Sequence, residues 1–276
     1  MKITTPINRL RPIAIAAFLW AVPGAHAQGW QVSPVRHELT IPPGQSQTFA
    51  IRVERETADA AEPVRFTATP RDWDLTRAGE SVEANAGTLP ETATSWMSFT
   101  PAVFNLKAAE YAWIRVTISV PKEAAPGVYR AGLFFEEHSA VPQSDAATRR
   151  MVLRYRLSTL IYVIVPRVEK SLEVHDLLAT DSAAEGLRFT AVLENTGTVH
   201  LRPQHWIEVF DPHGKQLLKL EPAPTMVVLP KRQLAVAIQV PKEKLPASSS
   251  YTVKYFVDGD RELPLKATTV SLIPQP

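Results

Sequence analysis

The sequence MVLRYRLSTLIYVIVP, residues Met151–Pro166, runs for sixteen residues without Gly, Asn or Asp and ends on a proline. Val, Ile, Leu and Tyr dominate it, which predicts one strand of about twice the usual length rather than a helix. Its first half alternates between two faces. One face carries Leu153, Tyr155 and Leu157, and the other carries Arg154, Arg156 and Ser158. Its second half is apolar on both faces, as expected of a strand that is covered on both sides. Such a strand should close one domain and lead into the next.

The first 27 residues have the pattern of a secretory signal peptide. A basic start is followed by the apolar run Ile13–Val22, which is too short to span a bilayer, and by the small-residue cleavage site Ala25-His26-Ala27. We therefore predict cleavage before Gln28 and a soluble mature protein in the periplasm. No Cys follows the cleavage site, so the mature chain is not expected to be a lipoprotein.

Composition excludes several classes of function. The signal region carries three basic and no acidic residues, so the remaining chain holds 27 Lys+Arg against 28 Asp+Glu. A nearly neutral chain gives no reason to propose a nucleic-acid partner. The absence of Cys removes disulfides, thiolate metal sites and a Cys nucleophile together.

Short β-type segments separated by Pro- and Gly-containing turns fill the rest of the chain, and no apolar helical period lasts three turns. The predicted fold is all-β, with two immunoglobulin-like β-sandwich domains in tandem, residues 28–166 and 167–276. The early strands are expected at Gln31–Ile41, Gln47–Arg55, Val64–Trp73, Trp96–Phe99, Ala102–Leu106, Tyr111–Val120 and Tyr129–Glu137. The later ones are expected at Ser171–Ala179, Leu187–Glu194, His200–Phe210, Leu217–Leu220, Gln233–Val240, Tyr251–Val257 and Leu263–Leu272. Two polar stretches, Asp74–Ser95 and His138–Thr148, are predicted to be long loops.

One internal repeat supports two related domains. The segment Ile118–Glu123, ISVPKE, recurs as Ile238–Glu243, IQVPKE. Each copy is followed by a Pro at the same offset and then by a Tyr that opens a strand, Tyr129 or Tyr251. Chance similarity between two strand ends remains the alternative, but a shared corner in two related sandwiches explains the match better.

No motif for catalysis or metal binding is present. The six His residues outside the signal region lack metal-ligand spacing, and there is no G-x-S-x-G or phosphate-binding loop. Asp258–Glu262 is too short for a calcium loop and is better explained as a polar hairpin turn. We expect no enzyme activity, no cofactor and no metal.

Arginines on the predicted strands are the most unusual feature. Arg36 lies in the first strand, and Arg149, Arg150, Arg154 and Arg156 gather at the start of the long strand. Arginines on an edge strand can simply prevent aggregation. Alternatively, arginines from the first and last strands converge on an anionic group, which a guanidinium binds in a bidentate manner.

Several segments together resemble a known family. Val32-Ser33-Pro34-Val35-Arg36 resembles the first strand of the periplasmic pilus-assembly chaperones (PapD-like), and Arg130–Phe135 is similar to their Arg-Glu-x-Leu-Phe segment, with Ala131 in place of Glu. Met151–Pro166 matches their donor strand and linker proline, and Glu194–Gly197 resembles their Asn-Pro-Thr turn. The similarity spans both predicted domains and is diffuse.

The resemblance implies that the chain binds subunits of a pilus or surface fibre by β-strand addition, without inserting into the membrane. It also implies an outer-membrane usher as a second partner. It further implies a carboxylate anchor, for which Arg36, Arg154 and Arg156 are the candidates, and a donor strand with Leu153, Tyr155 and Leu157. The family uses a Lys late in the long strand. Counting back from Pro166 places Ile161 there, or Tyr162 if the register slips by one residue, and only the slipped register puts the apolar residues in the donor positions.

A cell-envelope protein whose sandwiches act only as structural or adhesive spacers is the alternative hypothesis. The two hypotheses differ in the face with Leu153, Tyr155 and Leu157. In a spacer this face belongs to the core, whereas in a chaperone it is open before the client protein binds.

Overall fold

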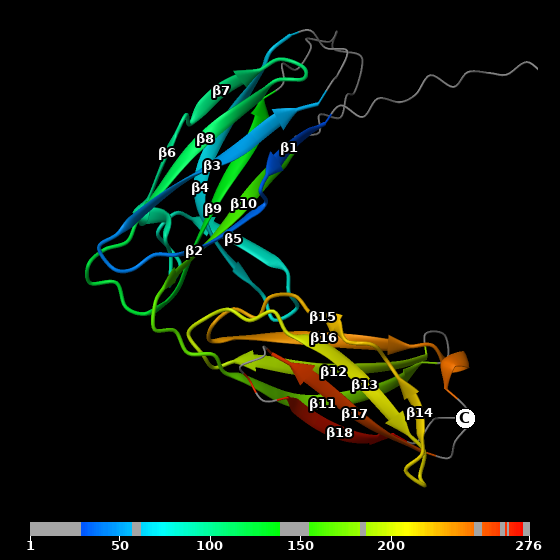
Figure 1. Cartoon of the computed structure of the whole chain (residues 1–276). Helices are drawn as coiled ribbons and strands as arrows, with labels where there is room; N and C mark the ends of the chain where they lie inside the picture. Colours follow the sequence, from blue (N-terminus) through cyan, green and yellow to red (C-terminus); the bar gives the residue numbers. More distant parts are fainter. Residues whose placement is uncertain are drawn as a thin grey trace, which may run out of the picture.

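The computed structural model describes residues 29–56, 62–138, 155–182, 186–245, 250–259, 263 and 265–272. The predicted signal peptide and the loop His138–Thr148 beyond its first residue lie outside the described residues. Within them the chain forms two β-sandwiches that meet at a bend (Figure 1), and the only helical segments are two 3-10 turns, Thr94–Trp96 and Lys242–Lys244. No helix in the described ranges is long and apolar enough to cross a membrane. The prediction of an all-β fold with two immunoglobulin-like sandwiches is confirmed.

The first sandwich pairs a four-stranded sheet, order β1-β3-β8-β6, with a six-stranded sheet, order β2-β10-β9-β4-β5, in which β7 also pairs with β4. All pairs are antiparallel except β2 with β10, which is parallel. The strands are β1 (Trp30–Ser33), β2 (Arg36–Thr40), β3 (Ser46–Arg55), β4 (Val64–Leu75), β5 (Ser81–Asn85), β6 (Met97–Thr100), β7 (Val103–Leu106), β8 (Tyr111–Ser119), β9 (Gly127–His138) and β10 (Arg156–Val165).

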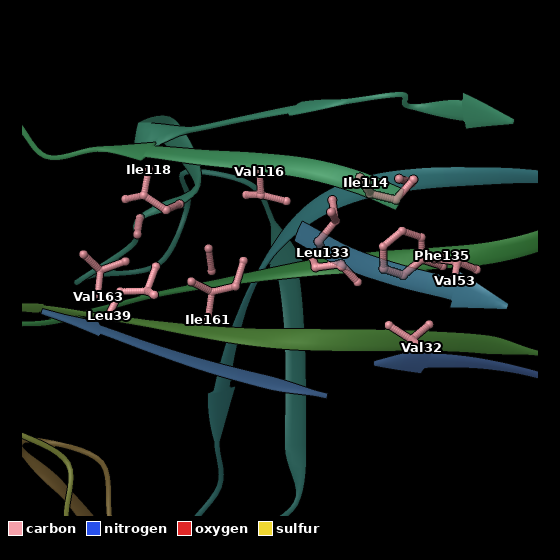
Figure 2. Packing of buried hydrophobic residues seen from close by; sticks show 14 of the residues in the cluster. Val32, Leu39, Val53, Ile114, Val116, Ile118, Leu133, Phe135, Ile161 and Val163 are labelled. Carbon is pink, nitrogen blue, oxygen red and sulfur yellow. The ribbon is translucent and has the colours of Figure 1, made fainter. Parts of the chain in front are cut away.

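Alternate residues of these strands fill the space between the two sheets, as Figure 2 shows. Ile114 of β8 lies opposite Leu133 and Phe135 of β9, and Ile118 lies opposite Val163 of β10; all five are fully buried. The spacing of two residues in the sequence therefore becomes one buried face on each strand.

The second sandwich pairs a three-stranded sheet, order β11-β12-β16, with a five-stranded sheet, order β14-β13-β17-β18, in which β15 also pairs with β13. A separate core of sixteen buried residues lies between these sheets. The strands are β11 (Leu172–Ser182), β12 (Gly186–Asn195), β13 (Gln204–Phe210), β14 (Gln216–Lys219), β15 (Ala223–Pro224), β16 (Arg232–Val240), β17 (Tyr251–Asp258) and β18 (Lys266–Leu272). Within the described residues, no strand pairs across the two sandwiches; the boundary at Pro166 remains a prediction.

Two details of the predicted strands were wrong. The stretch Asp74–Ser95 is not one loop, because β5 pairs with the end of β4 inside it. β5 has a mostly exposed sequence, SVEAN, so it carries no apolar alternation that could reveal it. The predicted strand Gln31–Ile41 is two strands, since Pro34 interrupts it and the chain crosses from one sheet to the other there.

The sequence repeat falls at equivalent corners of the two sandwiches. Its first copy ends β8 in the four-stranded sheet, and its second copy ends β16 in the three-stranded sheet. In both cases the next strand, β9 or β17, belongs to the opposite sheet. Val120 and Val240 are both buried at these corners.

β10 is covered on both faces at its C-terminal end, as its sequence predicts. Ile161, Val163 and Val165 point into the first core. On the opposite face Tyr162 is 2% exposed and joins a third apolar cluster that contains residues of both sandwiches. This interface cluster consists of Trp73, Val128, Tyr162, Val199 and Leu229.

A buried arginine reinforces the contact between the sandwiches. Arg130 of β9 is 2% exposed, and its Nη2 lies 3.5 Å from Oδ2 of Asp74. The same oxygen accepts hydrogen bonds from Nη2 and Nε of Arg232 in the second sandwich, at 2.8 and 3.1 Å. Glu91 lies 4.0 Å from both guanidinium groups. Asp74 and Glu91 together thus balance one cation from each sandwich.

The turn between β4 and β5 also contacts the second sandwich. The backbone N–H of Ala235 donates to the carbonyl of Arg77 at 2.7 Å. Gly79 has a φ of 84°, and a Cβ there would lie 2.6 Å from Sδ of Met226. Figure 1 shows this hairpin reaching toward β16. The glycine therefore permits both the turn and the close approach.

Replacing Asp74 should lower the free energy of unfolding more than replacing its partly exposed partner Arg232. Asp74→Ala leaves Arg130 buried without its closest counter-charge, and we expect a loss of about 3 kcal/mol in the free energy of unfolding. Arg232→Ala is the matched control, and because this side chain is partly exposed its loss should be about 1 kcal/mol or less. Urea denaturation measures both, and equal losses would contradict this description of the interface.

Candidate functional site

Among the described residues, β10 has no pairing partner on one edge of its N-terminal end. β9 pairs with one side of β10 along its whole length, but β2 covers the other side only at Leu160–Ile164. Just before β2, Leu160 N donates to the Val35 carbonyl at 3.0 Å. Along Arg156–Ser158, no strand in the described ranges pairs with this edge. An unpaired edge offers backbone N–H and C=O groups to another strand.

Apolar side chains continue beyond the core along this open end. Tyr155 and Leu157 are in phase with the buried residues Thr159 and Ile161, but they are 59% and 36% exposed. Tyr155 and Leu157 therefore continue the core-facing row of β10, its alternate residues that include Thr159 and Ile161, beyond the end of the core. Leu153, the third predicted member, lies outside the described residues.

The structure does not bring Arg156 to Arg36. Arg36 is opposite Leu160 in the β2–β10 register, four residues along the strand from Arg156. Arg156 instead contacts Glu83 of β5 at 2.5 Å, and its guanidinium lies over the Phe134 ring at 5.2 Å. Arg154 lies outside the described residues, so its place in the predicted carboxylate anchor stays a prediction.

A cleft of about 460 Å³ lies where the open edge meets the second sandwich. Arg36 lines it from the start of β2, and Arg202 lines it from the segment before β13. Its remaining lining comes from Val35, Ser158, Leu160, Tyr162, Thr225, Met226 and Val227. Tyr162 lines the cleft, whereas Ile161 is buried in the core. The choice between these two residues for the family's Lys position stays a prediction.

The two arginines that line this cleft come from different sandwiches and contact the same carboxylate oxygen. Oε1 of Glu38 forms an ion pair with Arg36, 3.1 Å from its Nε, and accepts a hydrogen bond from Nη2 of Arg202 at 2.6 Å. The Arg202 guanidinium lies 5.3 Å from the centre of the Tyr162 ring. Its Nη1 is buried and has no hydrogen-bond partner among the described residues. We call Arg36, Glu38, His200 and Arg202 the cleft cluster.

The cleft cluster has a positive net charge at neutral pH. Nε2 of His200 lies 3.4 Å from Oε2 of Glu38. Burial lowers the pKa of His200 below its ordinary value, and the charges of Arg202 and Arg36 act in the same direction against Glu38. When His200 is neutral, the two guanidinium groups and the one carboxylate give the cleft cluster a net charge of +1, which can attract an anion.

Sequence reasoning found Arg36 but missed Glu38, His200 and Arg202. Arg202 and Glu38 are 164 residues apart. Neither belongs to a motif, and His200 and Arg202 fall in a segment that was predicted to be part of a strand. Nothing in the sequence alone signals that this segment meets β2, because their contact depends on the placement of the second sandwich.

Comparison with known proteins gives structural similarity only. No family model matches the chain, and no curated protein matches it. Among solved structures, the class 5 fimbriae chaperone CfaA has a TM-score of 0.47 and 14% identity, covering 90% of this chain and 100% of its own. The SafB chaperone of Salmonella enterica, solved with the SafA pilin, has a TM-score of 0.42 and 11% identity, covering 89% and 98%.

The chain is similar to fimbrial chaperones. The Escherichia coli chaperone DraB is a further example, with a TM-score of 0.40, 13% identity and coverage of 89% and 97% of the two chains.

The stability of the protein should decrease as the pH falls below about 6.5. When folding lowers the pKa of a histidine, the unfolded state binds the proton at a higher pH than the folded state does. Acid therefore favours unfolding once the pH falls below the pKa of the histidine in the unfolded state. Burial lowers the pKa of His37 and His205 as well as that of His200. His200→Asn should therefore flatten, without abolishing, the fall in unfolding free energy between pH 7.5 and 5.5. Parallel pH profiles for the variant and the parent protein would contradict this.

Proposed function

We propose that this protein is a periplasmic chaperone that binds subunits of a pilus or surface fibre by β-strand addition. The observation that carries the proposal is the open edge of β10, with exposed Tyr155 and Leu157, leading directly to a cationic cleft. A client strand would hydrogen-bond to the edge, and its alternate side chains would pack against the apolar row. The export pattern of the first 27 residues supports the periplasm as its location.

The charges of the cleft select the direction of the client strand. A strand on the open edge lies in line with β2, and its end nearest to Arg36 enters the cleft. If the strand runs parallel to β10, this end is a C-terminal carboxylate; if it runs antiparallel, it is an N-terminal ammonium group. Arg36 and Arg202 attract the carboxylate and repel the ammonium group. The client strand is therefore parallel to β10, with its terminal carboxylate at Arg36.

Exposure of Tyr155 and Leu157 favours a chaperone over a spacer. A spacer has no reason to leave a large apolar row beside an unpaired strand edge, because such a surface promotes aggregation. A chaperone needs this row accessible until the client arrives. The predicted second partner, an outer-membrane usher, remains a proposal that follows from this function.

Charging the apolar row should abolish client binding without unfolding the protein. In the variant Tyr155→Glu plus Leu157→Glu, the new carboxylates remain in water because both side chains are already exposed. The suggested probe is a synthetic peptide that alternates Val or Leu with Thr or Ser and ends in a free carboxylate. We expect its Kd to increase more than tenfold, measured by fluorescence anisotropy, with an unchanged thermal midpoint.

Leu178→Glu is the matched control, since Leu178 is 62% exposed on β11 of the second sandwich. This control should bind the peptide as the parent protein does. If the double variant is insoluble, the row belongs to the core and the spacer hypothesis is favoured. If it is folded and binds normally, strand addition at β10 is wrong.

Arg36→Ala should weaken binding of the same peptide by about tenfold to a hundredfold, because the carboxylate loses a charge-assisted contact. Arg115→Ala, on the exposed face of β8, is the control and should have no effect. Stability should change little, since the Arg36 side chain is 54% exposed. Equal peptide affinity in Arg36→Ala and the parent protein would remove Arg36 from the anchor.

A further inference from the structure

We propose that the client's terminal carboxylate is held by both sandwiches, by Arg36 of the first and Arg202 of the second, so that client binding fixes their relative placement. The inference rests on the proposed function and adds a residue, Arg202, that the sequence did not suggest. It also adds a consequence, since binding becomes coupled to the arrangement of the two sandwiches.

The positions of the two guanidinium groups support a shared anion. Both contact the same oxygen of Glu38, so they lie side by side in the cleft. The Arg202 residue lines the cleft together with Arg36, and its buried Nη1 has no hydrogen-bond partner among the described residues. Glu38 neutralises only one of the two positive charges. A single further carboxylate would neutralise the other and could satisfy the free N–H groups.

Each arginine is attached firmly to its own sandwich. Arg36 opens β2, which is hydrogen-bonded to β10. Arg202 follows Leu201, which is buried and forms a bridge with Val228 of the second sandwich. Asn195 holds the same segment from within, since its Nδ2 donates to the carbonyls of Val199 and Val228 at 2.8 and 2.9 Å. A ligand that contacts both arginines must therefore favour the arrangement in which they are close together.

The contribution of Arg202 can be measured with two forms of the alternating peptide, one with a free carboxylate and one with a terminal amide. The ratio of their Kd values reports the carboxylate contact alone. We expect the amide to bind at least tenfold more weakly than the acid in the parent protein. Arg202→Gln and Arg36→Ala should each bring the ratio to within about threefold of unity. Arg202→Ala is a second variant for the case in which Arg202→Gln does not fold.

Arg232→Ala is the matched control, because it removes an ion pair between the sandwiches that lies outside the cleft. It should keep the ratio of the parent protein even if it lowers stability. If Arg202→Gln keeps the full ratio while Arg36→Ala loses it, the anchor belongs to the first sandwich and this inference is wrong. If both variants keep it, or if neither peptide binds the parent protein, the proposed function itself fails.

Coupling between the sandwiches can be observed directly, because the chain contains no Cys. Spin labels on Gln47→Cys and Lys215→Cys, two exposed positions, would report one distance between the sandwiches by pulsed electron paramagnetic resonance. The acid peptide should narrow the distance distribution, whereas the amide peptide should not. The same narrowing with Arg202→Gln, or no narrowing in the parent protein with acid peptide bound, would overturn the coupling.

Discussion

Burial of the Tyr162 ring controls how the two sandwiches fit together. Its neighbours Ile161 and Val163 face the first core, so Tyr162 points outward from the sheet and must be covered by something else. Trp73 packs against it at 5.2 Å and His200 of the second sandwich at 4.5 Å, measured between ring centres. The guanidinium of Arg202 lies over the same ring. Residues that seal the interface thus also place a cation in the cleft.

β10 both completes the packed sheet and offers an open edge, because its two ends have different surroundings. At Leu160–Ile164, β2 pairs with its edge and the second sandwich covers its outer face. At Arg156–Ser158 the edge lacks a partner in the described part of the chain, and Tyr155 and Leu157 extend the core row into solvent. The edge of β10 changes from open to paired at the point where the chain runs from Pro34 to Arg36 and crosses from one sheet to the other. A client strand placed on the open edge would continue the line of β2.

The sequence was sufficient to predict most of the fold because alternation is a local property. The doubly covered end of the long strand and most of the described strand positions follow from the side-chain pattern alone. β5 was missed because the mostly exposed sequence SVEAN has no apolar face. The cleft could be predicted only in part. Arg36 was found through its strand and the family resemblance, whereas Arg202 depends on a contact across 164 residues. Arg156 is predicted as an anchor from the arginine cluster on its strand and the family resemblance, and the sequence contains no signal for its contact with Glu83.

Glu38 explains how two arginines can stay close together in the absence of a client. Their like charges repel each other, and a shared carboxylate oxygen at 3.1 and 2.6 Å offsets this repulsion. Neutral His200 then matters, since a protonated imidazole beside Glu38 would compete with the arginines for the same carboxylate. Burial lowers the pKa of His200 and so removes this competition at neutral pH. The cleft therefore keeps one uncompensated positive charge in an assembled site, which is the condition for receiving one carboxylate.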